Sequence, residues 1–129
     1  MSEGPRVLLV DDDPAMLRLL EVNFRLAGFV VETASRGDDA VTRAIAAPPD
    51  ALVLDVMMPG LDGYQVGARV RDEPSMAATP IVFLTARAMD EDRAAGEALG
   101  SVDYLTKPFD PQDLVATVQR RLASSRDAS

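Results

Sequence analysis

The chain has 129 residues, 47% of them hydrophobic and 26% charged, a mixture typical of one globular domain and not of a disordered segment. It contains no cysteine and no histidine, which excludes disulfides, thiolate or imidazole metal sites, and histidine-dependent catalysis. The formal net charge of −8 argues against direct binding to nucleic acid or to an anionic membrane surface. Any chemistry must therefore rest on carboxylate, hydroxyl, lysine and arginine side chains.

The amino-terminal residues do not have the pattern of a signal peptide, which combines a basic stretch with an apolar one. No apolar run reaches the length of a membrane span. We therefore expect a cytoplasmic protein that does not engage a membrane.

Five short apolar segments alternate with helical patterns along the chain. Residues 7–10, 51–54 and 81–84 are almost wholly apolar, which predicts strands that are covered on both faces. Residues 29–33 and 102–105 carry polar interruptions, which favour strands at the edges of a sheet. The mixed segments are therefore predicted to flank the apolar ones.

A helix is expected after each strand. The first begins at Asp13-Pro14, a capping residue followed by proline at the first helical position, and Gly28 provides its stop. The other helices are predicted at residues 37–46, 63–72, 89–99 and 110–123. The domain is then expected to span residues 1–122, with 123–129 as a flexible tail or the start of a linker.

Five strand–helix units predict an α/β fold, in which helices cover both faces of a parallel sheet and the crossovers are right-handed. If the apolar strands are central and the mixed strands are edges, the strand order is 2-1-3-4-5. This is the flavodoxin-like, doubly wound arrangement, here with five helices.

Polar residues follow these strands at the edge of the sheet where such folds bind ligands. Asp11 and Asp12 follow the first strand, Asp55 the third and Thr85 the fourth, and Lys107 comes after the fifth. Although they are far apart in sequence, the topology predicts that they meet in one crevice.

Crowded carboxylates repel one another, and a divalent cation relieves the repulsion. Mg²⁺ is the best candidate because it takes hard oxygen ligands, keeps several waters and is often completed by a phosphate. A lysine and a threonine hydroxyl suit a phosphoryl group, and an aspartate can attack phosphorus to form an aspartyl phosphate. Since positioning and charge neutralisation dominate phosphoryl transfer, such a site needs neither histidine nor cysteine.

Four segments resemble the receiver domains of two-component response regulators, in the same order and at familiar spacings: VLLVDDDP, LVLDVMMPGLDG, PIVFLTA and DYLTKPF. The resemblance covers about residues 6–122. It implies a signalling domain, not a conventional enzyme, that assists its own phosphorylation by a sensor histidine kinase or a phosphotransfer protein and its own slow dephosphorylation. The signal would pass to a protein partner or an appended output domain through the face of the fourth helix, fifth strand and fifth helix, which is also a candidate dimer interface.

The resemblance assigns roles around the metal. Asp55 would be the phosphoacceptor and a metal ligand, Asp12 would bind Mg²⁺ directly, and Asp11 would act mainly through a coordinated water. The backbone carbonyl of Met57 would complete the metal site, so its side chain need not be polar.

It also assigns roles around the phosphoryl group. Thr85 and the backbone amide of Ala86 would hydrogen-bond to the phosphoryl oxygens, and Lys107 would pair with them. Tyr104 resembles the aromatic residue that changes rotamer as the threonine moves, although it is also consistent with simple edge-strand packing. The step from Lys107 to Pro108 resembles a cis-proline step of the family, but sequence cannot establish the isomer.

Several residues have a simpler structural explanation. Asp13 is best explained as a helix cap, and Asp62-Gly63 as turn and helix-start chemistry. One helix face is assigned only to the core: Met16, Leu17, Leu20 and Phe24.

Two other functions are weighed against the switch. A phosphohydrolase of the haloacid dehalogenase kind would need a second acid where Met57 stands. A nucleotide-binding flavodoxin-like module would need a glycine-rich loop after the first strand, where acidic residues stand instead.

Overall fold

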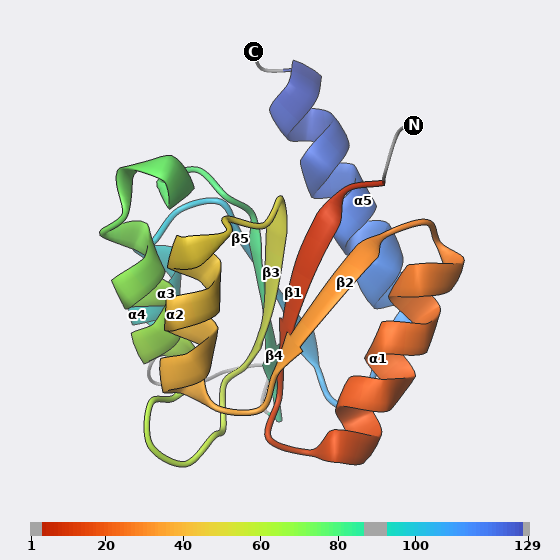
Figure 1. The fold of residues 1–129 in the computed structure, drawn as a ribbon, viewed down its shortest axis with the longest axis horizontal. Coiled ribbons are helices and arrows are strands. Elements are labelled where there is room, and N and C mark those ends of the chain that lie inside the picture. The colour runs from red at the N-terminus through yellow and green to blue at the C-terminus, as the bar shows by residue number, and fades with distance from the viewer. Residues whose placement is uncertain (1–3, 87–92, 128–129) are drawn as a thin grey trace.

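The computed structural model describes residues 4–86 and 93–127, and its five strands form one parallel sheet (Figure 1). The order β2-β1-β3-β4-β5 confirms the predicted order. The strands are β1 (Arg6–Val10), β2 (Val30–Ala34), β3 (Ala51–Asp55), β4 (Ile81–Thr85) and β5 (Val102–Thr106). Because all are parallel, their C-terminal ends lie at one edge, the lower one in Figure 1.

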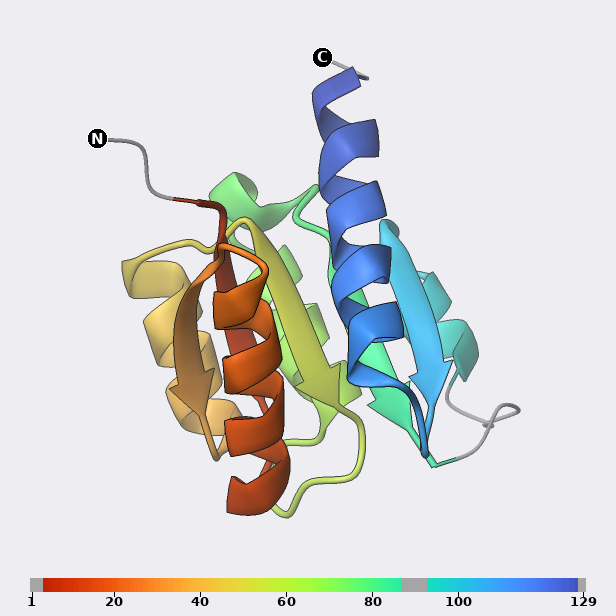
Figure 2. The same cartoon turned by 90° about the vertical axis from the view of Figure 1, so that its right-hand side faces the viewer.

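Helices cover both faces of this sheet (Figures 1 and 2). The helices are α1 (Pro14–Leu26), α2 (Gly37–Ala46), α3 (Gly63–Arg71), the 3-10 helix η1 (Pro74–Met76), α4 (Arg93–Glu97) and α5 (Pro111–Asp127). The helices α1 and α5 lie on one face, and α2, α3 and α4 lie on the other. Residues 89–92 of the predicted fourth helix lie outside the described residues. The helix ends at Glu97 because the chain turns through Gly100 and Ser101, both with positive φ.

The alternation of side chains along the strands produces two hydrophobic clusters. Leu52 of β3 and Phe83 of β4 point to the side of α3 and belong to the same cluster as Val66 of that helix. Val53 of β3 points to the opposite side, toward Phe24 of α1. Every residue of β3 and β4 is buried, which confirms that the apolar segments are the central strands.

The first helix forms for the reasons that its sequence suggests. The side chain of Asp13 accepts a hydrogen bond from the backbone N–H of Ala15, and Gly28 adopts a φ of 92° just past the helix end. Leu20 and Phe24 are buried. Met16 and Leu17 pack against the same cluster, which confirms the predicted core face.

The last helix runs further than predicted. It continues to Asp127 instead of ending near residue 123, so the expected flexible tail is helical through 127. No glycine or proline follows Leu122 to stop the helix. Its C-terminal turns project past the end of the sheet that lies opposite the candidate site (Figures 1 and 2). In the described part of the chain, no helix combines the length and the apolar character needed to cross a membrane.

Candidate functional site

The predicted site residues meet at the C-terminal edge of the sheet. Asp55 and Thr85 are the last residues of β3 and β4, Asp11 directly follows β1, and Lys107 directly follows β5. Because side chains alternate along a strand, Asp55 shares the α1/α5 side with Val53, whereas Thr85 shares the α3/α4 side with Phe83. The fold therefore places these groups around the rim of a single sheet edge.

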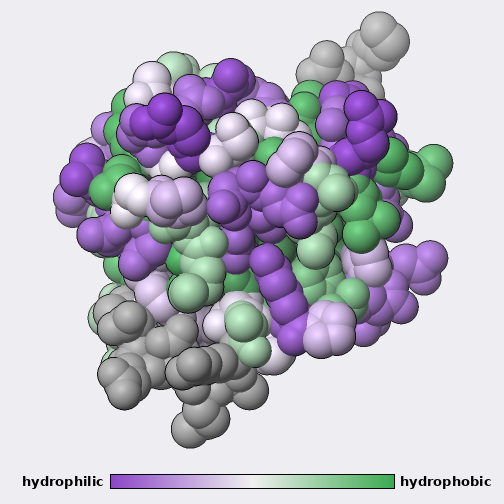
Figure 3. Space-filling view, turned by 90° about the horizontal axis from the view of Figure 1, so that it is seen from below, coloured by the Kyte–Doolittle hydropathy of each residue, from purple (hydrophilic) through white to green (hydrophobic). Residues whose placement is uncertain are grey.

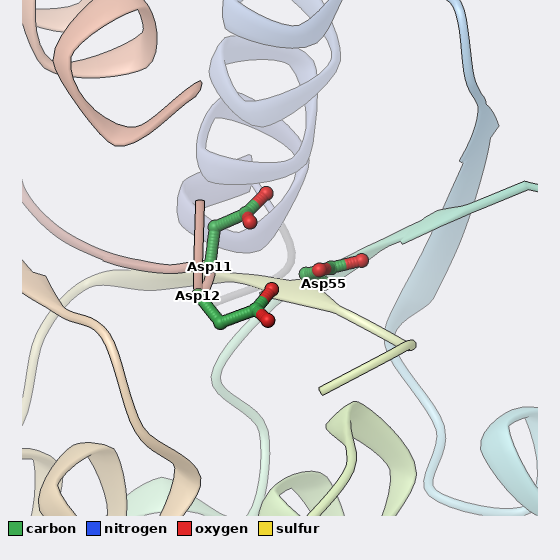
Figure 4. A group of neighbouring side chains, drawn as sticks. All are labelled: Asp11, Asp12 and Asp55. Carbon is green, nitrogen blue, oxygen red and sulfur yellow. The ribbon is translucent and has the colours of Figure 1, made fainter. Parts of the chain in front are cut away.

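Three carboxylates gather there. One oxygen from each of Asp11, Asp12 and Asp55 lies within 4.8 Å of the others (Figure 4). Asp11 and Asp55 are 0% and 3% exposed, whereas Asp12 is exposed to solvent. Seen from the end that carries the site, the middle of the molecule is covered mainly by hydrophilic residues (Figure 3).

Only one oxygen of the Asp11 carboxylate accepts a hydrogen bond from the described residues. Its Oδ1 accepts a hydrogen bond of 2.9 Å from the backbone N–H of Asp13, which joins the cluster to the start of α1. Its Oδ2 is buried and accepts no hydrogen bond from any residue that the structure describes. A buried carboxylate oxygen in this condition is costly unless a cation or water satisfies it.

Lys107 supplies the positive charge of the site. Its Nζ lies 3.2 Å from Oδ1 of Asp55 and 3.6 Å from Oδ2 of Asp11. Its backbone N–H donates a 2.7 Å hydrogen bond to the carbonyl of Thr85, which extends the pairing of β4 with β5. The peptide bond from Lys107 to Pro108 is cis.

Burial and charge together set the protonation of the site. Burial raises the pKa of the Asp55 carboxyl to about 6, the negative charge of Asp11 adds to the rise, and Lys107 opposes it. Burial works to lower the pKa of the Lys107 ammonium, but the charges of Asp55 and Asp11 raise it overall. At neutral pH Asp55 is therefore mostly an ionised, poorly solvated carboxylate beside a cation.

The remaining predicted residues flank this centre. The backbone N–H of Met57 donates to Oδ1 of Asp55 at 3.3 Å, while its side chain is 71% exposed. Thr85 is 3% exposed, and Ala86 after it is exposed.

Tyr104 lies on β5, the strand next to the one that carries Thr85. Its ring stacks on that of Phe83, with centroids 5.5 Å apart and an angle of 29° between the planes. Tyr104 faces Phe83 directly in the strand register, and Thr85 comes two residues after Phe83 on the same side of β4. The ring therefore lies next to the threonine end of the site.

Asp62 and Gly63 are helix-start residues, as predicted. Asp62 and Gln65 form a reciprocal capping box, with both hydrogen bonds at 2.9 Å. Sequence reasoning missed a further feature of Gly63, whose Cα packs against the backbone of Asp55. The only signal for it is a glycine at the first position of a helix, where many residue types are tolerated.

The donor set fits Mg²⁺. It consists of hard oxygens from three carboxylates, one of which is a buried oxygen without a hydrogen-bond donor among the described residues. Mg²⁺ binds through one or two carboxylates, keeps several waters and is completed by phosphate oxygens. Asp11, Asp12 and Asp55 are the residues that would hold it.

Comparisons with known proteins agree with this geometry. Residues 7–119 match the family model described as the response regulator receiver domain. The chain is 46% identical to the transcriptional regulatory protein PrrA of Mycobacterium leprae, over 92% of this chain and 50% of that protein. It spans about half the length of the curated relatives it matches.

Two solved structures are similar over nearly their whole length. A putative response regulator from Chloroflexus aurantiacus is 42% identical with a TM-score of 0.85, and the match covers 93% of this chain and 98% of that one. The receiver domain of a sensor histidine kinase from Pseudomonas aeruginosa is 34% identical with a TM-score of 0.84 and the same coverage. That second structure holds a magnesium ion coordinated in its active-site cleft.

Proposed function

The chain belongs to the response regulator receiver family, and from this premise we propose that it is a phosphorylation-controlled switch in which Asp55 accepts a phosphoryl group. The observation that carries the proposal is the Lys107 ammonium 3.2 Å from the buried Asp55 carboxylate, beside the carboxylates of Asp11 and Asp12. These groups together can neutralise and position a phosphoryl group next to an oxygen nucleophile.

In the proposed reaction, an oxygen of Asp55 forms a bond to phosphorus while the bond between phosphorus and the donor's leaving group breaks. The raised pKa of Asp55 still leaves the carboxylate ionised at neutral pH, as a nucleophile must be. Lys107 pairs with the transferred phosphoryl oxygens, and the hydroxyl of Thr85 and the backbone N–H of Ala86 donate hydrogen bonds to them.

The metal site would be formed by Asp12 directly, Asp11 through a water, Asp55, and the backbone carbonyl of Met57. When bound, Mg²⁺ offsets the negative charge of the carboxylates and of the phosphoryl oxygens. The protein's own contribution is to hold the carboxylates together, although they repel one another when Mg²⁺ is not bound. Thr85 and Tyr104 would then transmit the change in charge to the other side of the sheet.

The partners follow from the same proposal. A sensor histidine kinase or a histidine phosphotransfer protein would donate the phosphoryl group in the cytoplasm. The face formed by α4, β5 and α5 would carry the signal to a protein partner or an appended output domain, and it is also the proposed dimer interface. Slow self-catalysed loss of the phosphoryl group would return the switch to its resting state.

Acetyl phosphate with Mg²⁺ tests the proposal, with mass spectrometry of the intact protein as the readout. The wild-type protein should gain one phosphoryl group, and Asp55→Asn should gain none. Asp38→Asn, which removes an exposed acid from α2, is the matched control and should react like wild type. Equal labelling of wild type and Asp55→Asn would overturn the proposal, and sustained turnover of a small phosphoester would favour a hydrolase.

A further inference from the structure

The backbone of Gly96, inside α4, packs directly on two aromatic side chains. A Cβ on residue 96 would overlap the hydroxyl of Tyr104 and would lie 2.7 Å from Cε1 of Tyr64. Gly96 is buried. A glycine in the interior of a helix makes the helix less stable than an alanine at the same position would. The missing side chain therefore makes room that another residue type would remove.

The two tyrosines belong to a continuous stack of rings under α4. The ring centroids of Tyr64 and Phe83 are 4.9 Å apart, and those of Phe83 and Tyr104 are 5.5 Å apart. Tyr64 and Phe83 are 7% and 0% exposed and are enclosed by the hydrophobic cluster. Tyr104 is half-buried at the margin of that cluster, so its ring is the one member of the stack that is partly exposed to solvent.

The end of α4 next to Gly96 is anchored to α3. The Arg71 guanidinium donates hydrogen bonds of 2.9 Å and 2.7 Å to the carbonyls of Leu99 and Gly100. The side chain of Leu99 also closes against Gly67, where a Cβ would lie 2.9 Å from Leu99 Cδ1. Because these contacts keep α4 from moving away, a side chain added at residue 96 would displace the Tyr104 ring.

We propose that Gly96 is a positioning residue, which leaves space for the Tyr104 hydroxyl beneath α4 and thereby couples the position of that ring to the position of the helix. The inference rests on the proposed function for its role in signalling. Movement of Thr85 toward a phosphoryl group would free space on the side of β4 that faces Tyr104. The ring position beneath α4 and phosphoryl binding at Asp55 then favour each other.

The ring position can be measured directly because the chain has two tyrosines and no tryptophan. NMR spectra of protein with ¹³C-labelled tyrosine rings are assigned with Tyr104→Phe. In Gly96→Ala, the Tyr104 signals should move toward those of an exposed ring. Gly67→Ala is the matched control because it adds the same methyl group at the α3–α4 contact, against Leu99 and Phe83 instead of Tyr104.

Beryllofluoride with Mg²⁺ measures the coupling to the site. Gly96→Ala should weaken its binding about 5-fold or more, the lower range of coupling between two sites, and Tyr104→Phe in the same chain should restore part of the loss. Unchanged Tyr104 signals, an unchanged or tighter affinity, or equal effects of Gly67→Ala and Gly96→Ala would overturn the inference.

Two further outcomes are decisive. If Gly96→Ala does not fold, the double variant Gly96→Ala/Tyr104→Phe replaces it. Recovery of folded protein supports the hydroxyl contact, and continued unfolding would assign the decisive overlap to Tyr64 and overturn the inference. If the wild-type protein itself binds no beryllofluoride, the proposed function fails, while the ring signals of the unliganded variants still test the positioning role of Gly96.

Discussion

Gly63 at the start of α3 packs against the backbone of Asp55 at the end of β3. A Cβ on residue 63 would lie 2.5 Å from the carbonyl oxygen of Asp55 and 2.9 Å from Cα of Val56. The backbone N–H of Gly63 also donates a 3.1 Å hydrogen bond to the carbonyl of Val56. Because both contacts are with backbone, rotation of a side chain cannot relieve them. The proposed nucleophile is therefore held by the helix that follows it.

Gly63→Ala should move α3 away from the strand and disturb Asp55. We expect a loss of about 1–3 kcal/mol in the free energy of unfolding, the usual range for overpacking, together with weaker Mg²⁺ binding. Asp62→Ala is the control: it removes the helix cap and should lower stability by about 1 kcal/mol while leaving Mg²⁺ binding unchanged. Urea unfolding and Mg²⁺ titration measure both effects. Normal Mg²⁺ binding in Gly63→Ala would show that the contact does not shape the site.

Lys107 is the only lysine of the chain, so its ammonium can be observed without interference from another lysine. Its pKa is raised because the charges of Asp55 and Asp11 outweigh the opposing effect of burial. Asp55→Asn should therefore lower the pKa of Lys107, which NMR titration of the lysine side chain measures. In Asp103→Asn, which removes an acid paired with Arg121, the value should stay as in wild type. If the pKa of Lys107 is the same in Asp55→Asn as in wild type, the 3.2 Å ion pair between Lys107 and Asp55 does not form in solution.

Asp11→Asn should separate stability from metal binding. Asp11 raises the pKa of Asp55 by repulsion, so removing its charge should lower that pKa. Without metal, the variant should be more stable because the repulsion between the carboxylates of Asp11 and Asp55 is removed. Its Mg²⁺ affinity should fall roughly 10-fold or more, as for losses of groups that orient a metal site. Denaturant unfolding in the presence of a chelator and in excess Mg²⁺ should show opposite changes; a loss of stability in both would contradict the repulsion.

Mg²⁺ binding should depend on pH through Asp55. The metal binds the ionised carboxylate, and the pKa of Asp55 is raised to about 6. Protons therefore compete with Mg²⁺ below that pH, and the apparent affinity should fall toward tenfold per pH unit as the pH drops further below about 6. Above it, the affinity should level off. Calorimetric titration at several pH values measures the slope, and Asp55→Asn should lose this part of it.

The free energy of unfolding should also depend on pH through Asp55, but it should fall with rising pH, whereas the Mg²⁺ affinity rises. Because the folded pKa of Asp55 lies above its unfolded value of 3.8, the folded protein holds this proton more tightly. The contribution of Asp55 to stability is therefore greatest at low pH and declines as the pH rises through about 6. This decline is the energetic consequence of holding an ionised, buried nucleophile.

The order of the sheet and the meeting of the site residues could be predicted because both depend on local patterns. Apolar segments such as 51–54 indicate central strands, and in a parallel sheet the residue after each strand must lie at the common edge. Asp55, Thr85 and Lys107 could thus be brought together from their positions alone. The cap at Asp13 is equally local, since its carboxylate bonds to a backbone N–H two residues away.

Other features depend on contacts between segments far apart in the chain. In the sequence, Gly96 is only a residue that disfavours a helix. The structure shows that Tyr64 of α3 and Tyr104 of β5 occupy the space that a side chain at residue 96 would need. The helix α5 also continues past the predicted end at residue 123 to Asp127. Without a stop signal, a helix continues until the entropy cost of ordering further residues exceeds the free energy gained from their contacts.

The amino-acid sequence by itself determined the alternation of strands and helices, the central position of the apolar strands and the chemical groups at the sheet edge. These follow from side-chain periodicity and from the direction of parallel strands. Only the tertiary structure decided which oxygen of Asp11 is buried without a donor among the described residues, how far burial raises the pKa of Asp55, and where a glycine makes room for a ring. Each of these depends on solvent exclusion and on distances of a few ångströms between atoms whose residues are separated along the chain.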